Sequence, residues 1–473
     1  MIRRLLKDGT LYTISGVVSR GISLFLLPFY VRFLSIEEYG LLDLILLITN
    51  FINLTFSLEV TQAIARFVPS FRLQKPKVTL LTTGLGITLL SYSGFLVFFL
   101  LLKPIVIKYI ILDDLPNLTY NLVAAHVFLN GLFLFVQNNF RWTLQSLRFA
   151  YTSLIYTILN LVCVGVFVFY FQFGLNGILI SGIISTFLSL MVSFALQKNY
   201  YSGVFSFRYA VRILKFSMPL ILSAVAVYFS LYLDRILINS FLGIKELAVF
   251  GVAFRFAALV GLATTGFSSA LTPLIYNDPY STTTKDSVQI LFKHFVRASL
   301  LFLIFLTFFS SEILIFLTTP DYIEANILIP LVTSSMIFAS GYVFFPGLTL
   351  AKETGKLAII NVFSSLVNLI LCFIFIKKFG VIGVAFSTLI SSCVGLVLNV
   401  LYSRKYYNQS ISFLFQDSFI LIVSGLLLGV IVLNPWVFLD SFELLPFVFK
   451  ITIFLSLFLM YIFLMQKEKS STG

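Results

Sequence analysis

The chain has 473 residues, of which 59% are apolar and 17% aromatic, while only 11% carry a charge. Soluble domains carry about 25% charged residues and disordered chains are poorly hydrophobic, so both classes are excluded. The formal net charge of +13 indicates basic cytoplasmic loops, which orient membrane helices, rather than a nucleic-acid surface. Since a membrane helix takes about 20 apolar residues, the composition predicts an all-α polytopic membrane protein.

Fourteen apolar segments are expected to span the membrane, each ended by charges or turn residues. In chain order they cover approximately residues 10–34, 41–68, 79–102, 119–141, 151–171, 175–197, 214–240, 247–273, 290–316, 324–350, 356–376, 380–402, 413–433 and 444–465. The first segment is too long for the apolar core of a signal peptide, so we expect it to be retained. The connections are short, so neighbouring helices should be antiparallel and no soluble domain is expected between them.

Charge predicts the orientation of these spans. If the N-terminus is cytoplasmic, the loops on that side hold most of the basic residues outside the spans, and the opposite loops hold Lys103, Lys108, Lys245, Lys377 and Lys378. Basic residues accumulate in cytoplasmic loops. An even number of spans then predicts that both termini are cytoplasmic.

Two pairs of similar segments indicate an internal repeat. Phe173-Gly-Leu-Asn-Gly-Ile-Leu-Ile-Ser181 resembles Phe379-Gly-Val-Ile-Gly-Val-Ala-Phe-Ser387, and Phe33-Leu-Ser-Ile-Glu-Glu38 resembles Phe241-Leu-Gly-Ile-Lys-Glu246. The similar offsets predict a duplicated six-helix unit, with both copies inserted in the same direction as parallel repeats around a central cavity. The expected domains are an N-terminal lobe over 1–206, a C-terminal lobe over 207–405, and two extra helices with a tail over 406–473.

The motifs of common enzymes are missing from the sequence. There is no G-x-x-x-x-G-K-[ST] and no H-E-x-x-H, and the three cysteines fall inside apolar segments without a CxxC pair. The outer loops are too short for the catalytic loop of a membrane glycosyltransferase. The sequence therefore predicts no enzyme, no cofactor and no metal site.

Ionisable residues inside the spans are the candidate functional residues, because such groups are costly in the membrane. Arginines near either end of a span can extend to the interface, and we discount the charges in such positions: Arg32, Arg66, Arg141, Lys450, Asp43 and Glu312. The remaining set consists of Arg20, Glu59, Asp234, Arg235, Arg255 and Arg297. Arginine binds phosphate bidentately, so a cavity lined by Arg20, Arg255 and Arg235 would suit an anionic amphiphile. Glu59 or Asp234 would pair with an arginine or carry a proton; alternatively, the whole set forms buried ion pairs that orient helices.

Short motifs resemble those of the polysaccharide repeat-unit flippases of the Wzx type. They are the opening Gly9-Thr-Leu-Tyr-Thr-Ile-Ser-Gly16, Leu34-Ser-Ile-Glu-Glu-Tyr-Gly-Leu-Leu42, Ala63-Ile-Ala-Arg-Phe67 and the repeated Phe-Gly-x-x-Gly. These flippases belong to the multidrug/oligosaccharidyl-lipid/polysaccharide exporter superfamily, together with the lipid II flippases and the MATE multidrug exporters.

The resemblance implies that the chain moves an undecaprenyl-pyrophosphate-linked oligosaccharide from the inner to the outer leaflet of a bacterial cytoplasmic membrane, for example for O-antigen or capsule synthesis. It implies alternating access around a cationic cavity, in which Arg20 and Arg255 hold the diphosphate and Arg235 and Arg297 are weaker candidates. Proton or sodium antiport, or the membrane potential, would give direction, and a polysaccharide polymerase is a possible partner. The alternative is a cation-coupled multidrug exporter, for which an acidic cavity would be expected.

Overall fold

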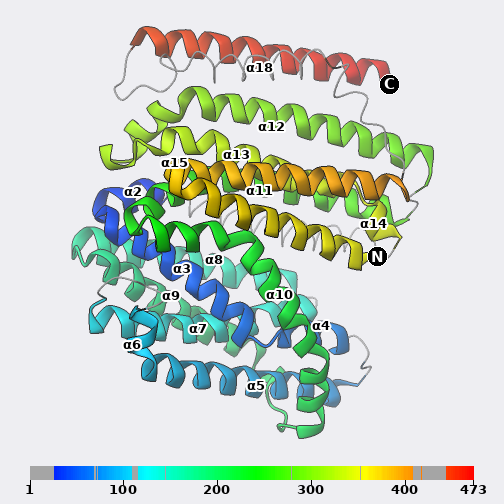
Figure 1. The fold of residues 1–473 in the computed structure, drawn as a ribbon. Coiled ribbons are helices and arrows are strands. Elements are labelled where there is room, and N and C mark those ends of the chain that lie inside the picture. The colour runs from blue at the N-terminus through cyan, green and yellow to red at the C-terminus, as the bar shows by residue number, and fades with distance from the viewer. Residues whose placement is uncertain are drawn as a thin grey trace. The chain divides into compact units, whose positions relative to one another are not determined.

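A computed structural model describes residues 26–68, 71, 73–108, 115–143, 145–277, 280–351, 353–407, 417 and 444–472. Every regular element in these ranges is a helix (Figure 1). Nine helices of this part are long and apolar enough to cross a membrane. The fold is therefore that of an all-α polytopic membrane protein, as predicted.

The chain divides into two compact units, residues 1–240 and 241–473. The first unit holds, in order, α2 (Leu27–Phe33), α3 (Ile36–Phe56), α4 (Val60–Phe67), α5 (Gln74–Leu101), α6 (Lys103–Val106), α7 (Asn117–Trp142), α8 (Ser146–Val164), the π-helix η3 (Gly165–Tyr170), α9 (Gly174–Gln197), the 3₁₀-helix η4 (Lys198–Tyr200) and α10 (Phe207–Phe241). Inside this unit α7 packs against both α5 and α9 (Figure 1). The unit boundary falls in the last turn of α10, whereas the expected lobe boundary precedes α10; the lobes remain a prediction.

The second unit continues with α11 (Ile244–Asn277), α12 (Thr282–Leu317), the 3₁₀-helix η5 (Pro320–Tyr322), α13 (Ala325–Ser340), the 3₁₀-helix η6 (Gly341–Phe344), α14 (Gly347–Leu350), α15 (Thr354–Arg404) and α18 (Leu444–Thr472). The long α15 contains both the eleventh and the twelfth expected spans. They join at Gly380, whose backbone is not helical (φ 57°, ψ −139°). The helix α18 packs against α12 (Figure 1).

Helices follow the expected spans from the second to the twelfth, and again at the fourteenth. Most of the first and thirteenth expected spans lie outside the described residues. Two expected spans are interrupted rather than continuous. The second breaks between α3 and α4, and the tenth breaks between α13 and α14. Hydropathy predicts that a segment is buried in lipid, but it does not report a local break of this kind.

The two copies of the repeated motif each contain a glycine in the left-handed region of φ. Gly174 and Gly380 both have positive φ, 54° and 57°. A Cβ on Gly177 would lie 2.8 Å from the carbonyl oxygen of Phe167, and one on Gly383 would lie 2.6 Å from that of Phe375. Each motif thus turns the chain and packs the next helix against the backbone of the preceding one, which accounts for the glycines at both positions.

The second repeated pair also falls at equivalent places. In the first unit Ser35 caps α3. The Ser35 hydroxyl accepts a hydrogen bond from the backbone N–H of Glu38, and the Glu38 carboxylate accepts one from the backbone N–H of Ser35. In the second unit Gly243, with φ 97°, directly precedes α11. Each segment therefore lies at the start of a long helix, α3 in the first unit and α11 in the second.

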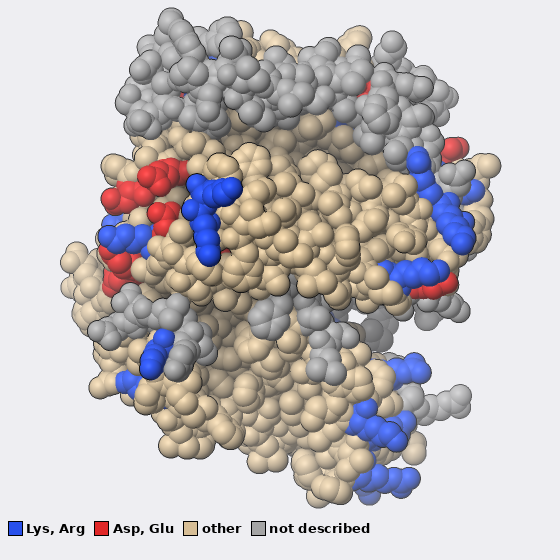
Figure 2. Space-filling view, in the orientation of Figure 1, with Lys and Arg blue, Asp and Glu red and all other residues tan. Residues whose placement is uncertain are grey.

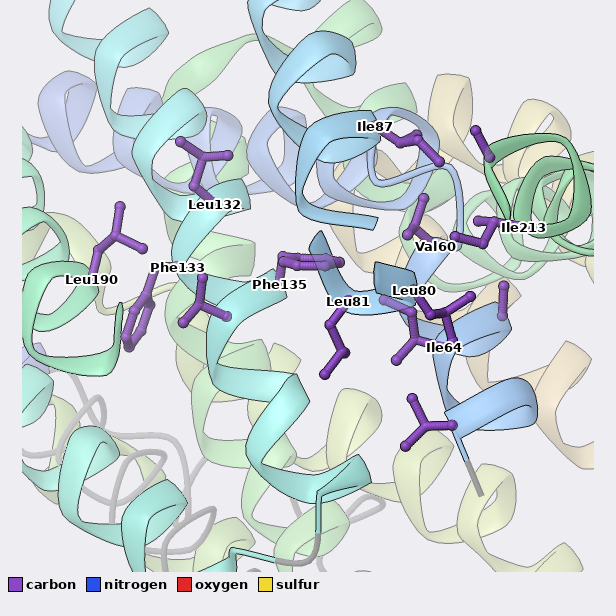
Figure 3. Close-up of a cluster of buried hydrophobic side chains, with 14 residues drawn as sticks. Val60, Ile64, Leu80, Leu81, Ile87, Leu132, Phe133, Phe135, Leu190 and Ile213 are labelled. Atoms are coloured by element: carbon purple, nitrogen blue, oxygen red, sulfur yellow. The ribbon is translucent and has the colours of Figure 1, made fainter. Parts of the chain in front are cut away.

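Each unit has an apolar core of its own. In the first unit Val60 and Ile64 of α4 meet Leu80 and Leu81 of α5 and Phe135 of α7 (Figure 3). In the second unit one cluster surrounds Phe292, Phe295 and Phe344, and another joins α12 to α18. On the face in Figure 2, charged side chains gather mainly toward the ends of the helices in each unit, with uncharged residues between them. This distribution suits helices that cross a hydrocarbon layer.

Candidate functional site

The break between α3 and α4 places an ionisable group within a broken membrane helix. Leu58 and Glu59 have φ of 50° and 49°, a left-handed conformation that is uncommon for residues other than glycine. Side chains provide hydrogen-bond partners for two backbone groups at the break. The Ser91 hydroxyl donates to the Phe56 carbonyl at 2.6 Å, and the Glu59 N–H donates to the Ser57 hydroxyl at 3.3 Å. The half-buried side chain of Glu59 is thus presented by a non-helical turn. Strained turns of this kind concentrate at functional sites.

A polar network lies next to this break in the first unit. The Asn53 amide donates to the Asn130 side-chain oxygen at 3.0 Å, and the Tyr92 hydroxyl donates to the Asn53 side-chain oxygen at 2.8 Å. The Tyr92 ring rests on Gly131, where a Cβ would lie 2.0 Å from a ring carbon. The network joins α3, α5 and α7 and fixes the part of α3 that leads into the break.

Arg235 of α10 lies in a buried ion pair with Asp43 of α3. The shortest distance between the guanidinium and the carboxylate is 3.2 Å, and the two side chains are 8% and 5% exposed. The guanidinium also lies 5.7 Å from the centre of the Tyr232 ring. About two turns before Arg235 in α10, the Tyr228 hydroxyl donates to the Leu47 carbonyl at 2.7 Å. The helices α3 and α10 are therefore joined by a charge pair and a hydrogen bond.

Arg297 of α12 lies in a second buried ion pair. Its Nη2 is 2.5 Å and its Nε 3.0 Å from Oδ2 of Asp417, and Lys293, one turn earlier, is 3.5 Å from the same oxygen. The side chains of Arg297 and Asp417 are 3% and 4% exposed. Two cations therefore share one carboxylate inside the second unit.

A third pair joins the other half of α12 to α18. Lys450 donates to Glu312 at 2.6 Å, and its side chain is 5% exposed. We expected both residues to extend to the interface, but the structure pairs them. A charge that is buried this deeply requires a partner, and each residue supplies it for the other.

The remaining candidates are distributed over both units. Asp234 is buried in α10 of the first unit, and Arg255 is half-buried in α11 of the second unit. Arg20 lies outside the described residues. The structure thus brings Arg235 together with Asp43 and Arg297 together with Asp417, while neither partner belonged to the predicted set. Within the described ranges, no group of three or more His, Cys, Asp or Glu side chains is placed to hold a metal ion.

The sequence interpretation missed three carboxylates that matter. Asp43 and Glu312 were discounted because they lie near the ends of spans, and Asp417, at the start of the thirteenth span, was not considered. The signal that could have found them is that an arginine deep in a span needs an opposite charge from another span. The pairing itself, over 192 residues for Asp43 and Arg235, needs the three-dimensional fold.

The sequence matches two protein-family models. Residues 5–277 match the model described as "Polysaccharide biosynthesis protein", and residues 219–374 match the MatE model. A curated relative, the probable low-salt glycan biosynthesis flippase Agl15 of Haloferax volcanii, is 26% identical over 236 residues. That alignment covers 47% of this chain and 49% of the relative, so the chain matches about half the length of this protein.

Solved structures share the fold over most of the chain. The lipid II flippase MurJ in an inward closed conformation matches with a TM-score of 0.77 at 18% identity, covering 97% of this chain and 99% of that one. An inward-facing multidrug resistance MATE family transporter of the MOP superfamily matches with a TM-score of 0.65 at 15% identity, covering 87% and 96%. These likenesses are to transporters, and at such identities they establish the fold alone.

Proposed function

Because the chain belongs to the polysaccharide biosynthesis protein family, we propose that it is a flippase for an undecaprenyl-pyrophosphate-linked oligosaccharide repeat unit. The observation that carries this proposal is the family match over residues 5–277. The fold, which resembles that of a lipid II flippase, and the glycan flippase among its relatives support it. The proposed direction is from the inner to the outer leaflet, by alternating access, without a catalysed reaction.

The cargo explains why a protein is needed. A glycan and a diphosphate cannot cross about 30 Å of hydrocarbon unaided, because each polar group would lose its hydrogen bonds to water. A polar cavity would hold these groups while the polyprenyl chain stays in the lipid. Arginine suits the diphosphate, since its planar guanidinium donates two parallel hydrogen bonds to a phosphate group.

We assign the diphosphate to Arg20 and Arg255. Arg255 is half-buried in a membrane helix, which keeps a guanidinium reachable while shielding it from much of the water. Arg235 and Arg297 remain weaker candidates, because each already lies against a buried carboxylate. A phosphate would have to displace that carboxylate and leave it buried without its partner, which costs free energy.

We assign coupling to Glu59 and Asp234, with a proton or a sodium ion as the coupled cation. Glu59 is supported by its position in a left-handed turn between two helices, the kind of interruption that forms ion sites in transporters. Asp234 is supported by its burial next to Arg235. The orientation that we propose, with both termini in the cytoplasm of a bacterium, rests on the charge of the loops. The polymer would be an O-antigen, a capsule or a related surface polysaccharide, and a polymerase would be the partner that takes up the product.

The second candidate function is a cation-coupled multidrug exporter, which the MatE match over residues 219–374 favours. An exporter of cationic drugs needs uncompensated acidic groups in its cavity. The carboxylates of Asp43, Glu312 and Asp417 each lie in an ion pair, so these three do not supply such a surface. The flippase is therefore the better supported proposal.

The experiment compares polyprenyl-linked lipids in the wild type and a deletion strain by mass spectrometry. Accumulation of one undecaprenyl-pyrophosphoryl oligosaccharide, together with loss of a surface polymer, would support the flippase and identify its cargo. An unchanged lipid pool and intact polymer, with new sensitivity to cationic drugs, would instead support the exporter.

Complementation of the deletion strain then tests the arginines. Arg20→Glu and Arg255→Glu should abolish polymer export while protein amount and membrane insertion stay normal. Arg208→Glu is the matched control, because Arg208 is an exposed arginine at the start of α10 and should retain export. Full export by Arg20→Glu or Arg255→Glu would remove that residue from the binding site without affecting the proposal of a flippase.

A further inference from the structure

A groove on the first unit lies between α5 and α7, with one side chain contributed by α9. Its volume is about 510 Å³, within the range of about 300–1,000 Å³ that is usual for small-molecule sites. The lining residues are Leu96, Leu100, Asn121, Ala124, Ala125, Phe128, Leu129 and Phe187. None of these residues belongs to the polar network, the ion pairs or the broken helix described above.

The shape of the groove follows from the size of its side chains. Ala124 and Ala125 leave space on α7, whereas Leu96 and Leu100 of α5 and Phe187 of α9 rise around it. Along α7 the lining runs from Asn121 to Leu129, which is about 12 Å at the 1.5 Å rise of an α-helix. Half of the hydrocarbon core of a bilayer is about 15 Å. The groove thus fits within one leaflet.

Polarity changes along the groove in the same direction. Asn121 is exposed and is the polar member of the lining. One turn toward the start of α7, Asn117 accepts a hydrogen bond from the Lys103 ammonium, which also lies 5.4 Å from the centre of the Tyr120 ring. A cation therefore stands at one end, an amide follows, and only apolar side chains line the remainder.

The charged end is held in place by aromatic contacts. Tyr120 stacks on Phe99 with ring centres 4.4 Å apart, and its hydroxyl donates to the Phe99 carbonyl. These contacts tie α5 to α7 next to the position of Lys103. A ligand would thus find the cation and the groove already formed, so that little ordering would oppose binding.

We propose that this groove is a binding site for one anionic glycerophospholipid. One acyl chain lies along Ala125, Phe128 and Leu96, Asn121 donates a hydrogen bond to the glycerol ester region, and Lys103 pairs with the headgroup phosphate. The length of the groove selects this occupant over a polyprenyl chain, which is longer than one leaflet is deep. The cation selects an anionic lipid over a zwitterionic one, whose positive charge would lie near the ammonium of Lys103.

Native mass spectrometry of the delipidated full-length protein tests the site. Phosphatidylglycerol and phosphatidylcholine with identical acyl chains are added, and the fraction of protein with one bound lipid is measured. The wild type should prefer phosphatidylglycerol. Lys103→Glu should weaken phosphatidylglycerol binding by about fivefold or more, since each basic residue near a membrane surface strengthens attraction to anionic lipids by about that factor, while phosphatidylcholine binding changes little. Ala125→Phe fills the groove and should reduce the binding of both lipids.

Two controls separate the site from general effects on the protein. Ala195→Phe adds the same ring at an exposed position of α9 outside the groove, and Lys378→Glu reverses an exposed lysine of the second unit; both should bind like the wild type. Equal binding by Lys103→Glu, Ala125→Phe and these controls would overturn the proposal. So would competition by a polyprenyl phosphate that is lost in Ala125→Phe while phosphatidylglycerol binding persists.

Discussion

The buried pair between Asp43 and Arg235 allows a quantitative test of how charges act in the first unit. Both side chains are less than 10% exposed, and their shortest distance is 3.2 Å. Replacing Asp43 by Leu leaves the guanidinium buried without its carboxylate, and Arg235→Met leaves the carboxylate buried without its cation. Breaking a buried pair from one side costs about 3–5 kcal/mol. The free energy of unfolding of each single variant should fall by that amount.

The double variant Asp43→Leu/Arg235→Met should behave differently. Removing both charges also removes the penalty for keeping one of them unpaired, so its stability should lie within about 1 kcal/mol of the wild type or above it. For a unit of this size, 1 kcal/mol corresponds to about 2–4 °C in the midpoint of thermal unfolding. The single variants should therefore melt about 6–20 °C lower, and the double variant should recover most of this loss.

The assay is thermal unfolding of the purified protein in one detergent, with Lys198→Met, which removes an exposed cation of the same unit, as the control. Export by the double variant is measured in the same strain. If the double variant loses as much stability as the two single variants together, the two residues do not compensate each other and the reasoning is refuted. A stable double variant that no longer exports would give Arg235 a role in transport, whereas a stable and active one would limit it to structure.

Two further predictions concern single positions. Gly131→Ala should destabilise the first unit by about 1–3 kcal/mol, because the added Cβ would overlap the Tyr92 ring. Gly94→Ala is the control and should not destabilise it, because a Cβ there meets no atom within 4 Å. Thermal unfolding of both variants checks this prediction, and equal midpoints would contradict it. The hydrogen bond from Lys356 and, as the next largest cause, the charge of Lys356 hold the pKa of the Glu353 carboxyl below its ordinary value of 4.5. The stabilising contribution of the Glu353 carboxylate is therefore present above that value and is lost as the pH falls through the lowered pKa. Glu353→Gln should thus lower the unfolding midpoint at pH 7 but not at a pH below the lowered pKa, and an equal loss at both pH values would contradict the assignment.

The sequence predicted the helices well because lipid imposes a simple rule on it. A segment that crosses the hydrocarbon must be long and apolar, and its ends are marked by charges and turns. The repeated Phe-Gly motif was informative for a related reason. Gly174 and Gly380 have positive φ, so a particular residue type was required at both positions and remained visible in the sequence.

The break between α3 and α4 could not be predicted in this way. Its left-handed residues are Leu58 and Glu59, and neither a glycine nor a proline marks the position. The tertiary contacts that stabilise it, such as the hydrogen bond from Ser91 to the Phe56 carbonyl, come from a different helix. A local pattern carries no information about such a contact.

The charges show the same division between local and tertiary information. A sequence reports that Arg235, Arg255 and Arg297 lie in apolar segments, and this alone made them equivalent candidates. Their surroundings distinguish them, because Arg235 and Arg297 are each held by a buried carboxylate, whereas Arg255 is only half-buried. A guanidinium that leaves a buried carboxylate to bind a phosphate leaves that carboxylate buried and unpaired, which costs free energy. Burial with a partner therefore favours a role in joining helices, and partial exposure favours contact with a mobile anion.

Along α12 this reasoning reaches the C-terminal part of the chain. Arg297 and Glu312 lie about 22 Å apart on the helix at 1.5 Å per residue, and their partners are Asp417 and Lys450. Between the two pairs, Leu301, Ile304 and Phe308 form an apolar cluster with Leu457 of α18. The two pairs have opposite polarity along α12, since its cation comes first and its anion second. Exchanging the positions of Asp417 and Lys450 along α12 would bring like charges together, and shifting α18 along α12 would separate Lys450 from Glu312. These pairs therefore specify how the C-terminal segment attaches to α12.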